Sequence, residues 1–101
     1  MYIYNVTIKV DWKIAEEWVE WMKQIHIPSV MDTGCFEKHV MVQLLETDET
    51  DGQTYAVQYF AESLSKYENY IEHYAPFLRE QTITKWGGKF IAFRSLMKVV
   101  S

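Results

Sequence analysis

The chain has 101 residues, enough for one small domain over residues 1–101. Its formal net charge is −4 and its basic residues form no cluster, which argues against binding to nucleic acid. A single cysteine excludes an internal disulfide, and no apolar stretch approaches the roughly 20 residues of a membrane-spanning helix. The N-terminus lacks the pattern of a secretory leader, so we expect a cytoplasmic protein without a membrane partner.

The first predicted element is a strand over residues 1–10, because apolar and other side chains alternate along it. The even-numbered positions carry Tyr, Val or Ile, and the opposite face includes Asn5, Thr7 and Lys9. This pattern is typical of a strand with one buried face.

An amphipathic helix is predicted next, because apolar residues recur at steps of three and four along one side: Ile14, Trp18, Trp21, Met22 and Ile25. Asp11 is placed to cap the start of this helix. Pro28 should end it near His26, because a proline disfavours helical geometry in the residue before it.

Two strands are predicted over 35–46 and 53–60, and Asp51-Gly52 between them is a hairpin signal in a longer polar loop. A second helix begins at Ser65, or slightly earlier at Ser63. Pro76 should bend or restart this helix, so that residues 64–86 do not form one straight rod. Gly87-Gly88 ends the helix, and the last strand covers 89–99.

The resulting order, β-α-β-β-α-β, predicts an α+β protein with a ferredoxin-like fold and an antiparallel sheet. This fold hosts unrelated enzymes, ligand sensors and RNA binders, so it does not specify a function. The chain also carries 4 Trp, 7 Tyr and 5 Phe. Each would bury about 150 to 250 Å², which exceeds what so small a core accommodates. We therefore expect a homodimer or an aromatic-lined pocket.

No motif of known catalytic chemistry is present, and no catalytic residue is assigned. His26, His39 and His73 lack the spacing of metal ligands, and neither a nucleophile turn nor a phosphate-binding glycine loop occurs. We expect no metal and no cofactor. The tyrosines of residues 1–6 and 55–59 resemble RNA-recognition motifs, but the second segment lacks a basic residue and follows an acidic turn.

Polar residues occupy several strand positions where apolar residues are expected: Asn5, Thr7, His39, Gln43 and Gln58. Together with Arg94 or Ser95 they would line a polar pocket if the strands bring them to one place. The alternative is a solvated sheet face or a wet dimer interface, which we favour because nothing in the sequence forces these side chains to converge.

Five segments resemble a family of small bacterial proteins designated a domain of unknown function: His26-Ile27-Pro28, Thr33-Gly34-Cys35-Phe36, Tyr55-Ala56-Val57-Gln58-Tyr59, Ala75-Pro76-Phe77-Leu78-Arg79 and Phe90-Ile91-Ala92-Phe93-Arg94. This family is similar in turn to the dimeric α/β-barrel group, which includes antibiotic-biosynthesis monooxygenases, stress-response barrel proteins and haem-degrading monooxygenases. The resemblance implies that two ferredoxin-like subunits pair sheet to sheet, each holding any ligand between its sheet and its helices. A haem degrader is expected to carry an Asn on the first strand and a Trp before a His on the second helix. Asn5 meets the first requirement, but Tyr67 and Tyr70 precede His73 at a different spacing.

Two functions follow as expectations. The first is a homodimer that binds a small aromatic or apolar molecule in the helix-sheet cleft, with a cofactor-free monooxygenase-like enzyme as one form of this function. The expected ligand-binding residues are Trp18, Trp21, Tyr67 and Trp86 around a ring, with His26, His39 and Arg94 orienting its polar groups. The second is a non-catalytic dimerisation or ligand-sensing module.

Arg94 lies between apolar neighbours in a predicted strand, so its charge needs a partner, water or an anionic ligand. Glu37 and Glu46 are the candidate carboxylate partners that would make Arg94 structural.

Overall fold

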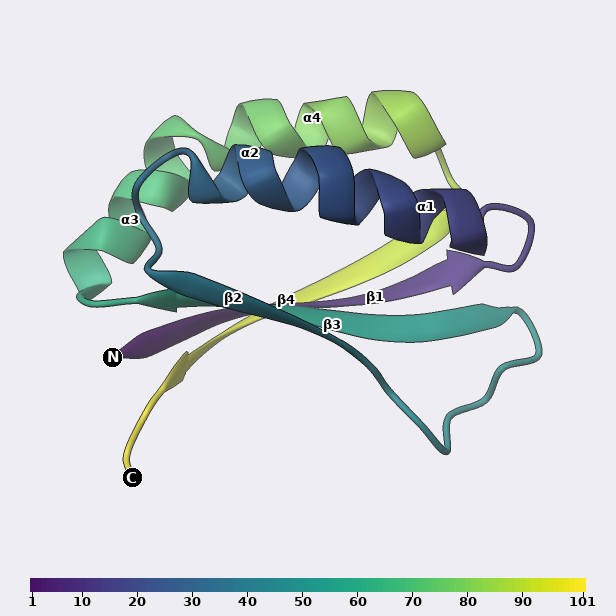
Figure 1. The fold of residues 1–101 in the computed structure, drawn as a ribbon, viewed down its shortest axis with the longest axis horizontal. Coiled ribbons are helices and arrows are strands. Elements are labelled where there is room, and N and C mark those ends of the chain that lie inside the picture. Colours follow the sequence, from purple (N-terminus) through teal and green to yellow (C-terminus); the bar gives the residue numbers. More distant parts are fainter.

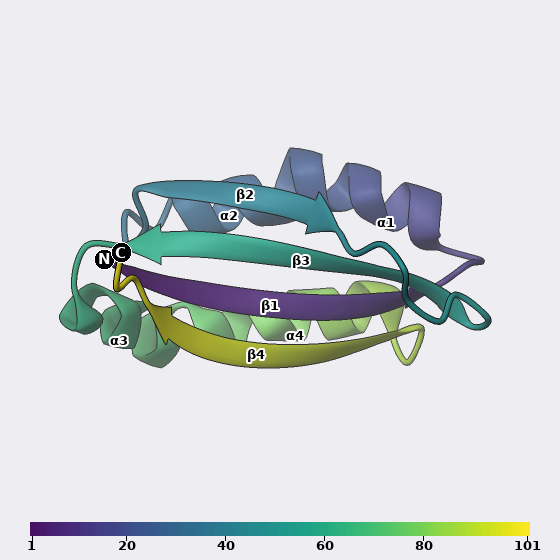
Figure 2. The same ribbon diagram turned by 90° about the horizontal axis from the view of Figure 1, so that it is seen from below.

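The computed structural model describes residues 1–101 as one four-stranded antiparallel sheet with every helix on the same face (Figure 1). The strands are β1 (Tyr2–Asp11), β2 (Lys38–Gln43), β3 (Gly52–Ala61) and β4 (Phe90–Lys98), in the spatial order β2-β3-β1-β4. Figure 2 shows the four strands side by side from the face that no helix covers. The predicted element order and antiparallel sheet are therefore confirmed.

The alternation of β1 decides which side chains meet the helices. Tyr4 lies opposite Tyr59 of β3, and Val6 lies opposite both Val57 of β3 and Arg94 of β4. Tyr4, Tyr59 and Val57 are buried, which identifies their face as the one that packs against the helices. The same register places Arg94 on this inner face, at the edge strand β4.

The first helical segment is longer than the sequence predicts. It runs without interruption through α1 (Ala15–Trp21), a π-helical turn η1 (Met22–His26) and α2 (Ile27–Met31). The prediction that Pro28 ends the helix near His26 is wrong.

The π turn explains how the helix passes Pro28. In a regular α-helix, Pro28 would offer no amide to the carbonyl of Gln24 and its ring would crowd that carbonyl. Here the wider turn shifts the bonding, and the Ile27 N–H donates to the carbonyl of Met22, five residues earlier. The Ser29 hydroxyl supplies a further bond by donating to the carbonyl of Ile25 at 2.7 Å.

The second helical segment is broken, as predicted. It consists of α3 (Leu64–His73) and α4 (Ala75–Trp86), separated at Tyr74, where φ is −121° and ψ is −39°. Pro76 occupies the first turn of α4, where a helix requires no amide hydrogen bond from it. Figure 1 shows the two helices meeting at an angle.

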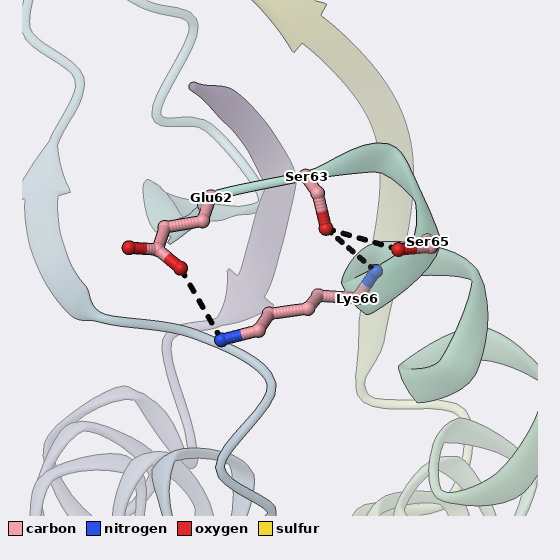
Figure 3. Close-up of polar contacts among 4 residues, drawn as sticks. All are labelled: Glu62, Ser63, Ser65 and Lys66. Atoms are coloured by element: carbon pink, nitrogen blue, oxygen red, sulfur yellow. Dashed lines mark hydrogen bonds and ion pairs between the residues drawn. The ribbon is translucent and has the colours of Figure 1, made fainter.

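The helix starts differ in part from the predicted caps. Ser63, the earlier of the two candidates, caps α3 by accepting a hydrogen bond from the Lys66 N–H at 3.3 Å (Figure 3). Lys66 also forms an ion pair of 3.4 Å with Glu62. Asp11 does not cap the first helix: it ends β1, and its carboxylate accepts from the Lys13 N–H at 2.8 Å.

The ends of the other elements follow local geometry. The strand expected over 35–46 is shortened to β2, because Cys35 and Phe36 are buried in the connection that precedes it. Gly87 ends α4 with a φ of 62°, a conformation that favours glycine. No helix combines the length and apolar character needed to cross a bilayer.

Candidate functional site

A cavity of about 210 Å³ lies between the inner face of the sheet and the helices. Most of its walls are apolar and include Val6, Ile8, Trp18, Val57, Leu78 and Phe90. These side chains come from three strands, the first helical segment and α4, so the cavity depends on the whole β-α-β-β-α-β arrangement.

Tyrosines form one end of the cavity. Tyr4, Tyr59 and Tyr70 line it, and the ring centroids of Tyr4 lie 6.1 Å from Tyr59 and 5.7 Å from Tyr70. Phe36 supports them from behind, 4.9 Å from Tyr70 and at an angle of 63°. Burial raises the pKa of both Tyr59 and Tyr70 well above the ordinary value, so both hydroxyls remain protonated at neutral pH.

The hydroxyl of Tyr59 has no hydrogen-bond partner, although the residue is only 2% exposed. Arg79 of α4 also has a buried donor without a hydrogen-bond partner. Its Nη2 donates to the Tyr4 hydroxyl at 3.0 Å, but its Nε is buried without an acceptor. Buried polar groups in native proteins are nearly always paired, so these two donors are unusual, as are Trp86 Nε1 and Thr47 Oγ1, which are unpaired outside the cavity lining.

Arg94 reaches the cavity from β4. The ion pair between Lys66 and Glu62 is the only salt bridge in the structure, so neither of the candidate partners, Glu37 and Glu46, pairs with Arg94. Arg94 is also exposed, because β4 is an edge strand, and it does not pay the desolvation cost of a buried charge. Its guanidinium is therefore free of any carboxylate partner within the chain.

His26 completes the polar part of the lining. It is the last residue of the π turn, and its ring stacks on Trp21 with a centroid distance of 5.1 Å and an angle of 25°. Burial, reinforced by the positive charge of Arg94, lowers the pKa of His26 to about 4. The imidazole is therefore neutral at pH 7 and presents one donor and one acceptor.

The structure brings three of the seven predicted site residues to the cavity wall: Trp18, His26 and Arg94. Three others form a layer behind it. Trp21 packs edge-to-face on Trp86 at 5.8 Å, and Tyr67 packs on Tyr4 at 5.6 Å.

The seventh predicted residue, His39, is exposed on β2 and lies in a separate groove beside Lys23 and Pro28. His73 lies elsewhere again, at the end of α3. No three His, Cys, Asp or Glu side chains are close enough together to hold one metal ion.

Four lining residues were not among the predicted site residues: Tyr4, Tyr59, Tyr70 and Arg79. Strand alternation places Tyr4 and Tyr59 on the buried face, and a buried tyrosine hydroxyl needs a partner, which was an available signal. Arg79 directly follows Leu78, which is buried, so it lies at the margin of the buried side of α4.

The row of polar strand residues lies outside the cavity. Asn5 donates to Thr7 at 3.0 Å and to Ser95 at 3.4 Å, and Gln58 lies opposite Asn5 on β3. All four lie on the helix-free face, whereas the register places His39 opposite Tyr59 and Gln43 opposite Tyr55, on the inner face of the edge strand β2. The polar strand residues therefore do not converge, and the hypothesis that they line one pocket together is wrong. Arg94 does not belong to the row, because its neighbour Ser95 occupies the helix-free face and Arg94 the inner one.

Comparison with solved structures shows the same fold. A dimeric ferredoxin-like protein from an uncultured marine organism has a TM-score of 0.70 and 12% identity, covering 100% of this chain and 96% of that one. A proposed antibiotic biosynthesis monooxygenase from Nitrosomonas europaea has a TM-score of 0.68 and 14% identity, with both chains covered completely at 100%. SnoaB, a cofactor-independent oxygenase from Streptomyces nogalater, has a TM-score of 0.68 and 12% identity, covering 99% of this chain and 94% of that one.

At these identities the likeness establishes the fold alone, and it confirms the predicted α+β, ferredoxin-like class. No curated protein matches the chain. One family model, described as a domain of unknown function (DUF4286), matches residues 1–100, in agreement with the resemblance seen in the sequence. Because this match spans nearly the whole length, the chain belongs to the DUF4286 family.

Proposed function

We propose that the protein is a homodimer that binds a small aromatic or apolar molecule in the cavity between its sheet and its helices. The observation that carries this proposal is the largely apolar cavity of about 210 Å³ with polar groups that lack partners at its wall. Small-molecule sites commonly combine apolar walls with a few convergent polar groups. An apolar cavity of about 150 Å³ accepts benzene, so this cavity has room for one substituted ring.

The unsatisfied donors support an occupied cavity. Leaving a buried polar group without a partner costs about 1 to 3 kcal/mol. Tyr59 and Arg79 would both be relieved by a ligand that brings hydrogen-bond acceptors. A purely structural core would favour apolar side chains at these two positions.

The geometry favours binding over oxygenation. A reaction that begins with removal of a proton from the substrate requires a general base, ideally with a pKa near the operating pH. His26 has a pKa of about 4, and the tyrosines that line the cavity are protonated, so neither is a strong base at pH 7. The polar groups are better suited to orienting a bound molecule.

The helix-free face supports self-association. Phe93 and Ile91 of β4 flank the polar row of Asn5, Thr7 and Ser95 on one side, and β2 contributes exposed valines on the other. Phe93 is 68% exposed. Exposed apolar residues around a polar centre suit an interface between two copies of the sheet. Two solved structures with this fold are described as dimeric ferredoxin-like proteins, which supports self-association.

Ligand binding is testable with neutral aromatic probes and two matched variants. Thr82 lines the cavity, whereas Thr84 of the same helix is exposed and does not. Indole and p-cresol should raise the melting temperature of the wild type and of Thr84→Trp. Thr82→Trp fills the cavity and should abolish the shift. Equal shifts in both variants, or no binding by calorimetry to any of the three proteins, would contradict the proposal.

A further inference from the structure

The cavity carries positive charge that nothing in the chain neutralises. Of its lining residues, Arg79 and Arg94 are charged at pH 7, and none is acidic. This is not a consequence of composition, because the chain has 14 acidic residues against 10 basic ones. The acidic residues are therefore segregated away from the cavity.

Both arginines retain unused hydrogen-bonding capacity. A guanidinium has five N–H donors and accepts no hydrogen bond. Arg94 has no ion pair, and the partner of Arg79 is the neutral hydroxyl of Tyr4. The buried Nε of Arg79 in particular has no acceptor within the chain, and Arg79 lines the cavity.

Tyr59 adds a third donor to the same wall. Its side chain is 98% buried, since its exposed fraction is 2%, and its hydroxyl has no partner. Both arginines act electrostatically on one further hydroxyl of the lining, that of Tyr70. Burial raises the pKa of Tyr70, and the charges of both Arg79 and Arg94 act on that hydroxyl in the opposite direction. Two guanidinium groups and the unpaired hydroxyl of Tyr59 thus line the same, mainly apolar cavity.

We propose that the cavity selects an aromatic molecule that carries one carboxylate. Its ring lies among Trp18, Val57 and Leu78, and its carboxylate accepts hydrogen bonds from Arg79, Arg94 and the hydroxyl of Tyr59. Planar guanidinium groups match the geometry of a carboxylate, and charge-assisted hydrogen bonds are stronger than neutral ones. This inference rests on the proposed function, because it specifies the chemistry of the molecule that occupies the same cavity.

The test compares three probes of one shape and different charge: 4-methylbenzoate, 4-methylbenzamide and 4-methylbenzylammonium, titrated calorimetrically at pH 7.5 and low salt. The benzoate should bind at least about tenfold more tightly than the amide. The ammonium compound should show no measurable binding, because it would place a like charge beside the two guanidiniums.

Substitutions separate a specific site from general attraction. Arg94→Gln and Arg79→Gln should each weaken benzoate binding about tenfold and leave amide binding within about twofold. Arg94→Lys should recover part of the loss. Lys98→Gln is the matched control, because it removes a positive charge from the same strand outside the cavity lining. Should Arg79→Gln fail to fold by circular dichroism, Arg94→Gln on the exposed edge carries the test.

The outcomes distinguish this inference from the proposed function. Equal affinity for benzoate and amide, or equal losses in Arg94→Gln and Lys98→Gln, would overturn the charge selectivity while the cavity remains a binding site. Failure of all three probes, together with failure of indole and p-cresol, would overturn both proposals.

Discussion

The two faces of the sheet are built from the same four strands, yet they satisfy their polar groups in opposite ways. On the helix-free face, the Asn5 amide donates to both Thr7 and Ser95. On the inner face, the Tyr59 hydroxyl is almost completely buried and has no partner. The polar centre of the helix-free face is thus paired within one chain, whereas the inner face leaves a buried donor without an acceptor. The proposed ligand would supply that acceptor, and the proposed dimer would cover the apolar residues of the other face.

Truncating one aromatic residue on each face should give the largest contrast. Trp18 is 1% exposed and lines the cavity, so Trp18→Ala should lower the free energy of unfolding by about 4 kcal/mol. Phe93 is largely exposed in one protomer, so Phe93→Ala should change it by less than about 0.5 kcal/mol at dilutions where the chain is monomeric. Urea denaturation measures both values. Similar losses for the two variants would show that the faces are not distinct in this way.

Acid should weaken the inner face through His26. Its pKa is about 4 in the folded chain and about 6.5 when unfolded, so below pH 6.5 the unfolded state binds the proton more readily. Stability should therefore fall between pH 6.5 and pH 4, by up to about 3 kcal/mol from this group. His26→Gln should flatten that part of the profile, measured by urea denaturation at each pH. An unchanged slope would mean that His26 is not desolvated as the structure indicates.

A charge on the helix-free face should disrupt the proposed dimer. Phe93→Asp would place a carboxylate in the interface and should weaken dimerisation by more than about tenfold. Phe77→Asp is a matched control, because Phe77 is 66% exposed but lies on α4, on the helical side. Sedimentation at micromolar concentration should find the wild type and Phe77→Asp at twice the chain mass, and Phe93→Asp at the chain mass. A monomeric wild type would refute the dimer.

The smallest effect concerns the unpaired hydroxyl. Tyr59→Phe removes a buried donor without removing a hydrogen bond, so it should stabilise the ligand-free protein by about 1 kcal/mol. Tyr4→Phe breaks the 3.0 Å bond from Arg79 and should destabilise it by a similar amount. Thermal unfolding should therefore show a higher melting temperature for Tyr59→Phe than for the wild type, and a lower one for Tyr4→Phe. A loss of stability in Tyr59→Phe would imply that the hydroxyl has a partner in solution.

The sequence predicted those features that depend on local patterns. Strand alternation and helical periodicity are properties of neighbouring residues, so the element order and the break before Pro76 were predictable. The passage of the helix through Pro28 was not, because the π turn rearranges hydrogen bonds without changing the periodicity that a sequence displays.

For the candidate site, the same distinction holds. Trp18 and Arg94 reach the cavity because helix periodicity and strand register place them on inward faces. The unsatisfied state of Tyr59 and Arg79 depends on which side chains meet across β1, β3 and α4. That is a tertiary property, and residue spacing along the chain does not encode it.

The π turn makes the first helical segment sensitive to chain length at one point. It accommodates one more residue than a regular α-helical turn, and His26 is its last residue. Deleting a single residue from 22–25 would remove that extra residue and let a regular α-helix form, with the flanking parts of the helix keeping nearly their present faces. Pro28 would then lie opposite the carbonyl four residues before it, which its ring crowds and to which it offers no amide. A one-residue deletion here would therefore cost stability through Pro28, although the sides of the helix would stay nearly in register.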